Sequence, residues 1–237
     1  MTMITVWARR APLAGALAAL FLVSACGGGG GGSDGTGASS GRPAPNPQPN
    51  PPTNSCSAAG VAASTASSAA ATVCLLTSKG EIVIELESVK APVTVANFLQ
   101  YVNEGFYTST LFHRVVPGFV VQGGGFITGS VAKTGLRSAI VLESNNGLSN
   151  VRGTIAMART SVPNSATSQF YVNSVDNSAC LDHGRTSCDT TGNGYAVFGR
   201  VISGLSTIDA ISAEPQLYAG AETPATEVLL YWAKQLR

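Results

Sequence analysis

The sequence predicts a mainly β domain, in which short antiparallel strands form a closed barrel and helices cover its ends. Three observations support this fold class. Short stretches in which apolar and polar residues alternate, the pattern of half-buried strands, recur between residue 73 and the C-terminus. Turn signals such as Pro117-Gly118 and Asn145-Asn146-Gly147 separate these stretches. Two other segments carry apolar residues at helical spacing, and many short strands with few helices are typical of β-barrels.

The domain begins with two predicted strands. The first is Val73–Thr77, and Ser78-Lys79-Gly80 predicts the turn that ends it. In the second, Ile82, Ile84 and Leu86 stand at every second position, so that one face is apolar. Because side chains alternate between the two faces of a strand, we expect this strand to be half-buried.

Two helices and a last strand follow along the chain. Pro92 suits the first turn of a helix, and Gly105 is a suitable C-terminal stop. Between them, apolar residues recur at helical spacing: Val95, Phe98, Leu99, Val102 and Phe106. The second helix is predicted at Leu205–Ser212, with Ser203 near its N-cap. The last strand is predicted at Glu227–Trp232.

The N-terminus has the pattern of an export signal. Arg9 and Arg10 precede an apolar run, Ala11–Val23, which is short for a transmembrane helix and suits a signal peptide. The run ends in Leu22-Val23-Ser24-Ala25-Cys26, which resembles the lipobox of bacterial lipoproteins. On this reading residues 1–25 are removed and Cys26 carries the lipid that holds the protein on the periplasmic side of a membrane, with the outer membrane favoured. The alternative is an ordinary signal peptide with an incidental cysteine.

Residues 26–71 are predicted to be a tether in front of a domain at residues 72–237. Gly27–Gly41 is rich in glycine and serine, a flexible composition, and Arg42–Thr53 is proline-rich and expected to be extended. Ala58–Ala71 is rich in alanine and serine, and the sequence leaves open whether it is a short helix or coil. Whether the tether spaces the domain from a membrane or is simple disorder also stays open.

The cysteine count predicts disulfides. The chain has five cysteines, and if Cys26 is lipidated an even number remains. In an exported protein an even set favours disulfides over free thiols. Three pairings are possible, and sequence proximity favours Cys56–Cys74 with Cys180–Cys188.

Two strand-like stretches carry the candidate functional residues. They are Phe112–Gly124 and Ser168–Asn173. Each has a glutamine among apolar and aromatic residues, and the first adds an arginine. A surface that is apolar apart from one guanidinium and two amides suits a neutral peptide segment, and not hydrolysis or phosphate transfer.

These stretches resemble the cyclophilin family of peptidyl-prolyl cis-trans isomerases. The resemblance continues through Asn146-Gly147-Leu148, Arg152–Thr160 and Tyr195–Val201, and covers about Val73 to Arg237. The motif Gly123-Gly124-Gly125-Phe126 is similar to the exported bacterial branch of the family. The resemblance implies eight antiparallel strands in a closed barrel capped by two α-helices. It also implies an enzyme that assists the folding of exported proteins by rotating X-Pro peptide bonds. The alternative is a binding module or holdase of the same fold without turnover.

The resemblance also implies a role for individual residues. Arg114 matches the catalytic arginine, and Gln122 matches the glutamine that orients it. The residues that match substrate-binding positions of the family are His113, Phe119, Val120, Ala158, Arg159, Thr160, Gln169, Tyr171, Leu181 and Tyr195.

Composition excludes several other partners. The net charge is +1 and only 11% of the residues are charged, so we expect no nucleic-acid partner. His113 and His183 are the only histidines and lie far apart in the sequence, so we expect no metal site. No cofactor is expected, the partners are proline-containing unfolded polypeptides, and the protein is expected to be a monomer.

Overall fold

The computed structural model of this chain describes residues 49–237, so the predicted signal peptide, Cys26 and the tether up to residue 48 lie outside the described residues. The described part contains one antiparallel sheet of eleven strands and four helices. No helix among residues 49–237 is long and apolar enough to cross a membrane. The strands are β1 (Ala71–Thr77), β2 (Gly80–Leu86), β3 (Thr110–Phe112), β4 (Arg114–Val116), β5 (Val120–Gly123), β6 (Phe126–Ile127), β7 (Val131–Ala132), β8 (Thr154–Met157), β9 (Phe170–Asn173), β10 (Val197–Ser203) and β11 (Val228–Gln235). The helices are α1 (Ala58–Ala66), α2 (Pro92–Asn103), α3 (Ser178–Leu181) and α4 (Leu205–Ser212).

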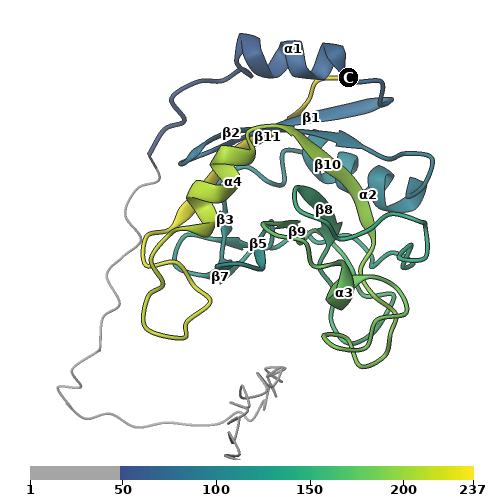
Figure 1. Cartoon of the computed structure of the whole chain (residues 1–237). Helices are drawn as coiled ribbons and strands as arrows, with labels where there is room; N and C mark the ends of the chain where they lie inside the picture. Colours follow the sequence, from purple (N-terminus) through teal and green to yellow (C-terminus); the bar gives the residue numbers. More distant parts are fainter. Residues whose placement is uncertain (1–48) are drawn as a thin grey trace, which may run out of the picture. The chain divides into compact units, whose positions relative to one another are not determined.

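The sheet runs in the order β4-β5-β9-β8-β10-β2-β1-β11-β3-β6-β7 and curls around the core (Figure 1). The mainly β class is therefore confirmed, but the sheet has eleven strands instead of eight. Several of them are only two to four residues long, because short breaks divide longer extended stretches. One such break is His113, which separates β3 from β4. In the described part, no hydrogen-bonded ladder joins the two end strands of the sheet, so a closed barrel is not confirmed.

Both predicted helices are present. In α2, Pro92 occupies the first turn, and the N-cap residue Ala91 has no side chain that can cap. The carboxylate of Glu143 takes that role by accepting the backbone N–H of Val93 at 3.1 Å and of Thr94 at 2.7 Å. Helix α4 has the predicted bounds, Leu205–Ser212, but Ser203 is not its N-cap. Its N-cap is Gly204, with φ 90°, because any Cβ there would clash with the carbonyl oxygen of Glu81.

The main core lies on the inner face of the sheet and is rich in aromatic side chains. Phe98 of α2 packs against the rings of Tyr107, Phe170 and Phe198, with centroid distances between 5.1 and 5.6 Å. All four side chains are fully buried. Helix α2 therefore packs its apolar face against the main core, as the helical spacing of its apolar residues predicts.

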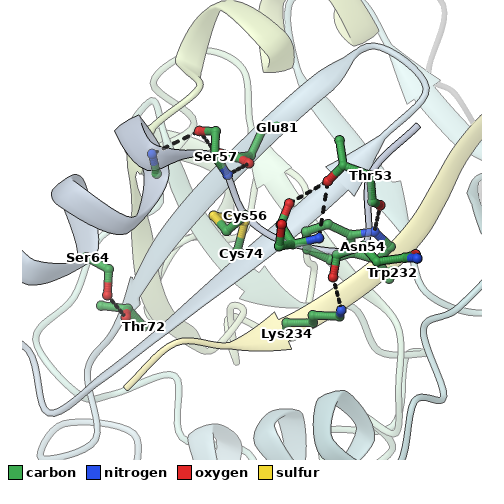
Figure 2. The surroundings of a disulfide bond; sticks show 12 residues. Thr53, Asn54, Cys56, Ser57, Ser64, Thr72, Cys74, Glu81, Trp232 and Lys234 are labelled. Carbon is green, nitrogen blue, oxygen red and sulfur yellow. Dashed lines mark hydrogen bonds between the residues drawn. A yellow bond between two sulfur atoms is a disulfide. The ribbon is translucent and has the colours of Figure 1, made fainter. Parts of the chain in front are cut away.

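Residues 53–67, which we name the N-terminal strap, lie across the outer face of β1, β2 and β11 (Figure 2). The indole N–H of Trp232 donates to the carbonyl oxygen of Thr53 at 2.8 Å. Cys56 is bonded to Cys74 of β1, with 6.2 Å between their Cα atoms. Under the strap, Cys74, Leu76, Val83 and Trp232 form a second apolar cluster. This cluster is why β2 is buried on both faces and not half-buried as predicted.

The strap lies within residues 26–71, the segment that the sequence predicts to be a tether. Residues 58–66 form α1, which settles the question of helix or coil in that segment. Ser57 caps the helix by accepting the N–H of Gly60 at 3.0 Å, and its own backbone N–H donates to Glu81 at 2.7 Å. Residues 53–67 therefore belong to the folded domain, because a disulfide and buried contacts fix them to the sheet. The flexible tether stays a prediction for residues 26–48.

Candidate active site

One row of cross-strand neighbours forms the base of the site. Arg114 of β4 pairs with Gln122 of β5, and Gln122 pairs with Tyr171 of β9. Tyr171 pairs with Ala156 of β8, which pairs with Val197 of β10. Directly opposite residues in an antiparallel sheet share a face, so these five side chains lie on one face of five adjacent strands. The residues between them face the main core: Val115, Val121, Val172 and Ile155.

The polar end of the row is a chain of hydrogen bonds. Arg114 donates from Nη1 to Oε1 of Gln122 at 3.3 Å. Gln122 donates from Nε2 to Oε1 of Gln169 at 3.0 Å. Gly125 makes room for the second glutamine, since a Cβ at that position would lie 2.5 Å from Gln169 Cγ. The two amides are thereby fixed in one orientation relative to the guanidinium.

The guanidinium has a partner that the sequence did not indicate. Arg114 donates from Nε to Oε2 of Glu222 at 2.7 Å and from Nη2 to Oε1 at 3.1 Å. Glu222 lies in the segment between α4 and β11, more than a hundred residues away in the chain. No motif marks this glutamate, because its position depends on how that segment folds back onto β4.

The apolar end of the row is a separate cluster on the same face. The buried side chains of Val120, Tyr171, Leu181, Ala156 and Val197 form its base. Phe119, Ala158 and Tyr195 pack against them and are only partly buried. The structure therefore brings together four of the predicted substrate-binding residues: Phe119, Val120, Tyr171 and Leu181.

Buried polar contacts hold this cluster from behind. The hydroxyl of Tyr171 donates to Oδ1 of Asn150 at 2.7 Å, and burial raises the pKa of that hydroxyl well above its usual value. Asn150 in turn donates its backbone N–H to Asp182 at 2.7 Å. Asp182 directly follows α3, so the network fixes the end of the helix that carries Leu181.

The side chain of Arg159 is buried and paired within the domain. Its side chain is 1% exposed and forms an ion pair with Asp189, which is 7% exposed. It also donates from Nε to the carbonyl oxygen of Gly194 at 2.9 Å. Burial alone would raise the pKa of Asp189, but hydrogen bonds from Thr191 and the charge of Arg159 hold it below its ordinary value. The Arg159 side chain therefore anchors the loop of residues 182–194.

A hollow lies beside the two glutamines. It is lined by Gln122, Ala158, Arg159, Thr160, Ser165, Thr167 and Gln169. The backbone N–H of Thr160 donates to Oγ of Ser165 at 3.0 Å, which closes a short turn at its rim. The hollow and the apolar cluster share Ala158, so the predicted backbone segment of residues 158–160 borders both.

His113 is partly buried between β3 and β4. Its ring centroid lies 4.4 Å from that of Phe126, and its Nδ1 atom is buried without a hydrogen-bond partner. Burial, together with the charge of Arg114, lowers its pKa from 6.5 to about 4. The imidazole is therefore neutral at physiological pH and adds no second charge beside the arginine.

Residues 49–237 contain one group of potential metal ligands, Cys56, Cys74 and Glu81. The two sulfur atoms are bonded to each other, so they offer no thiolate to a metal. This group also lies under the strap, on strands other than those of the row.

A comparison with models of protein families gives the family. Residues 72–231 match the model described as "Cyclophilin type peptidyl-prolyl cis-trans isomerase/CLD". This chain is a member of the cyclophilin family. The match begins within β1 and ends within β11, so it includes every strand of the sheet at least in part and leaves out the strap.

Bacterial cyclophilins resemble this chain closely. It is 52% identical to "Peptidyl-prolyl cis-trans isomerase A" of Dickeya dadantii over 140 residues, which is 59% of this chain and 70% of the relative. It is 50% identical to "Peptidyl-prolyl cis-trans isomerase B" of Escherichia coli over 135 residues, which is 57% of this chain and 80% of the relative.

Solved structures support the fold. A cyclophilin type peptidyl-prolyl cis-trans isomerase of Cryptosporidium parvum, crystallised in the presence of the dipeptide Ala-Pro, superposes with a TM-score of 0.53. It is 23% identical, and the match covers 68% of this chain and 96% of that structure.

The predicted disulfide pairings are both found in the structure. Besides Cys56–Cys74, the structure joins Cys180 to Cys188, with 5.1 Å between their Cα atoms. Cys180 lies in α3, next to Leu181 of the apolar cluster. The disulfide and the Arg159–Asp189 pair therefore hold the same loop from two sides.

Proposed function

We propose that this cyclophilin isomerises X-Pro peptide bonds of unfolded or folding exported proteins, with Arg114 as the catalytic residue. The observation that carries the proposal is the shared face. A guanidinium held by two glutamines and an apolar cluster lie on one row of adjacent strands. A proline ring fits the apolar end, and the peptide group before it then lies toward the polar end.

The chemistry needs only a hydrogen-bond donor. Rotation about an X-Pro bond is slow because the amide resonance is lost halfway through the rotation. This loss creates a barrier of about 18–20 kcal/mol. In the twisted state the prolyl nitrogen becomes pyramidal and recovers a lone pair. A donor that binds this lone pair stabilises the twisted state and not the planar ground states. One such preorganised donor contributes about 3–4 kcal/mol, on the order of a thousandfold in rate.

Arg114 meets the requirements for that donor. A guanidinium stays protonated at every physiological pH and carries five N–H groups. Its contact with Gln122, and through it with Gln169, orients it relative to the apolar cluster. Gln169 is the expected partner of the substrate carbonyl, and the backbone at Ala158–Thr160 is the expected partner of the extended substrate chain.

The localisation is part of the proposal. The signal-like residues 1–25 and Cys26 favour export and a lipid anchor in the outer membrane, with the domain facing the periplasm. Two disulfides among the described cysteines fit an oxidising compartment. For the fold, the continuity of β3 and β4 through His113 favours the closed form of the barrel.

A protease-coupled isomerisation assay on a short X-Pro peptide tests the function. We expect Arg114→Ala to lower kcat/KM at least a hundredfold with the fold intact, as read from its circular dichroism spectrum. Arg137→Ala, which removes an exposed arginine paired with Glu104, is the matched control and should keep full activity. Peptide binding without turnover by the unaltered chain would favour the holdase function instead. Near-normal turnover by Arg114→Ala would refute the role of the arginine.

A further inference from the structure

The outer edge of β4 is covered by a loop that the family resemblance did not point to. We name residues 215–225 the edge loop. It is a hairpin-like turn in which Leu217 donates its backbone N–H to the carbonyl oxygen of Thr223 at 2.9 Å. β4 is the first strand in the sheet order, so its outer edge has no neighbouring strand. The edge loop supplies the missing partners.

Two contacts fix the edge loop to Val115, the residue after Arg114. The backbone N–H of Val115 donates to the carbonyl oxygen of Glu222 at 2.6 Å. The side-chain amide of Gln216 donates to the carbonyl oxygen of Val115 at 3.4 Å. The backbone of Glu222 is therefore held against β4 independently of its side chain. The backbone N–H and carbonyl groups of Val115 at the edge of the sheet also gain hydrogen-bond partners.

The side chain of Glu222 then binds one particular edge of the guanidinium. Its two oxygen atoms accept from Nε and Nη2 of Arg114 in a bidentate pair. Gln122 accepts from Nη1. Of the five N–H groups, one on Nη1 and one on Nη2 have no acceptor among residues 49–237. These two remain to bind a substrate.

We propose that Glu222 is a positioning residue that selects which donors of Arg114 face the twisted X-Pro bond. The inference rests on the proposed function of the site. A bidentate carboxylate fixes both the plane and the rotation of the guanidinium, which a single bond to Gln122 does not. A donor that binds only the twisted state contributes to kcat and not to the binding of the planar substrate. Loss of its orientation therefore lowers kcat more than it changes KM.

The ion pair between Arg114 and Glu222 contributes little to folding stability. The Arg114 side chain is 32% exposed and that of Glu222 is 51% exposed, and solvent-exposed ion pairs stabilise a folded protein only weakly. Arg137 and Glu104 form a pair of the same type, 39% and 49% exposed, away from the row. A catalytic effect of removing Glu222 is therefore separable from a loss of the folded state.

The test compares Glu222→Ala, Glu222→Asp and the control Glu104→Ala in the full chain. For Glu222→Ala we expect kcat to fall about tenfold with KM changed less than about twofold, because orientation and not binding is lost. Glu222→Asp keeps the carboxylate and should recover part of the loss. Glu104→Ala should match the unaltered chain.

A second measurement does not depend on activity. In nitrogen-15 NMR spectra, the Nε–H of an arginine bound to a carboxylate exchanges slowly with water. We expect this signal for Arg114 in the unaltered chain and its loss in Glu222→Ala. Unchanged or increased turnover by Glu222→Ala, with the unaltered chain active, would overturn the inference, as would persistence of the Arg114 signal. An inactive unaltered chain would instead overturn the proposed function, and the NMR signal would still decide whether Glu222 holds Arg114.

Discussion

The guanidinium carbon of Arg159 lies 4.5 Å from the centroid of the Tyr195 ring, in a cation–π contact between a residue that lines the hollow and one that packs against the apolar cluster. The same guanidinium pairs with Asp189 and with the carbonyl oxygen of Gly194. A single buried side chain thus connects the predicted substrate segment to the far side of the loop of residues 182–194. The position of residues 158–160 therefore depends on that loop.

We expect Arg159→Met to destabilise the protein by about 3–5 kcal/mol, because it leaves the buried carboxylate of Asp189 without its charge partner. The measurement is the urea dependence of unfolding. The double variant Arg159→Met with Asp189→Leu removes both charges and should be more stable than Arg159→Met alone. If the single and double variants unfold at the same urea concentration, the pair does not hold the loop.

Reduction of Cys180–Cys188 should raise the KM for an X-Pro peptide more than it lowers kcat. The disulfide limits how Leu181 is presented to the proline ring, whereas Arg114 lies on a separate strand. In the chain-entropy model it contributes about 2–3 kcal/mol to stability. The variant Cys180→Ser with Cys188→Ser is compared with the unaltered chain. Equal KM values for the variant and the unaltered chain would show that the disulfide stabilises the loop without affecting substrate binding.

The Cys56–Cys74 disulfide should matter for stability and not for catalysis. Its removal by Cys56→Ala with Cys74→Ala should lower the free energy of unfolding by about 3 kcal/mol and leave kcat/KM within about twofold. The reason is the position of the strap on β1, β2 and β11 (Figure 2), whereas Arg114, Gln122 and Tyr171 lie on β4, β5 and β9. A large loss of turnover in the folded variant would contradict this separation.

His113 should make folding stability depend on pH. Its pKa is lowered from 6.5 to about 4 in the folded state, so below pH 6.5 the unfolded chain binds a proton that the folded chain does not. The contribution of the neutral imidazole to the free energy of unfolding is fully present above pH 6.5. This contribution is lost as the pH falls from 6.5 toward 4. The loss is at most about 3 kcal/mol.

Two measurements check this dependence on pH. In a His183→Gln background one histidine remains, and its NMR titration should have a midpoint near pH 4. His113→Phe should reduce the loss of stability between pH 7 and pH 4 relative to that background. A midpoint near 6.5 would show that His113 is exposed to solvent.

Periodic patterns in the sequence predicted the elements that depend on local chemistry. Alternation gave β2, and Pro92 with helical spacing gave α2, because both patterns describe one buried face. The alternation did not predict that Val83 is buried as well. Its outer face is covered by the N-terminal strap, which comes from a segment with the composition of a linker.

The motifs around Arg114, Gln122 and Gln169 identified the family and the candidate catalytic residues from the sequence alone, because each motif carries side chains of a distinct chemistry. The register of β4, β5, β9, β8 and β10 then decided that these side chains share a face with the apolar cluster. Tertiary structure alone decided the partners of the two arginines. Glu222 and Asp189 are ordinary loop carboxylates in sequence, and only the folding of their loops brings one to Arg114 and buries the other against Arg159.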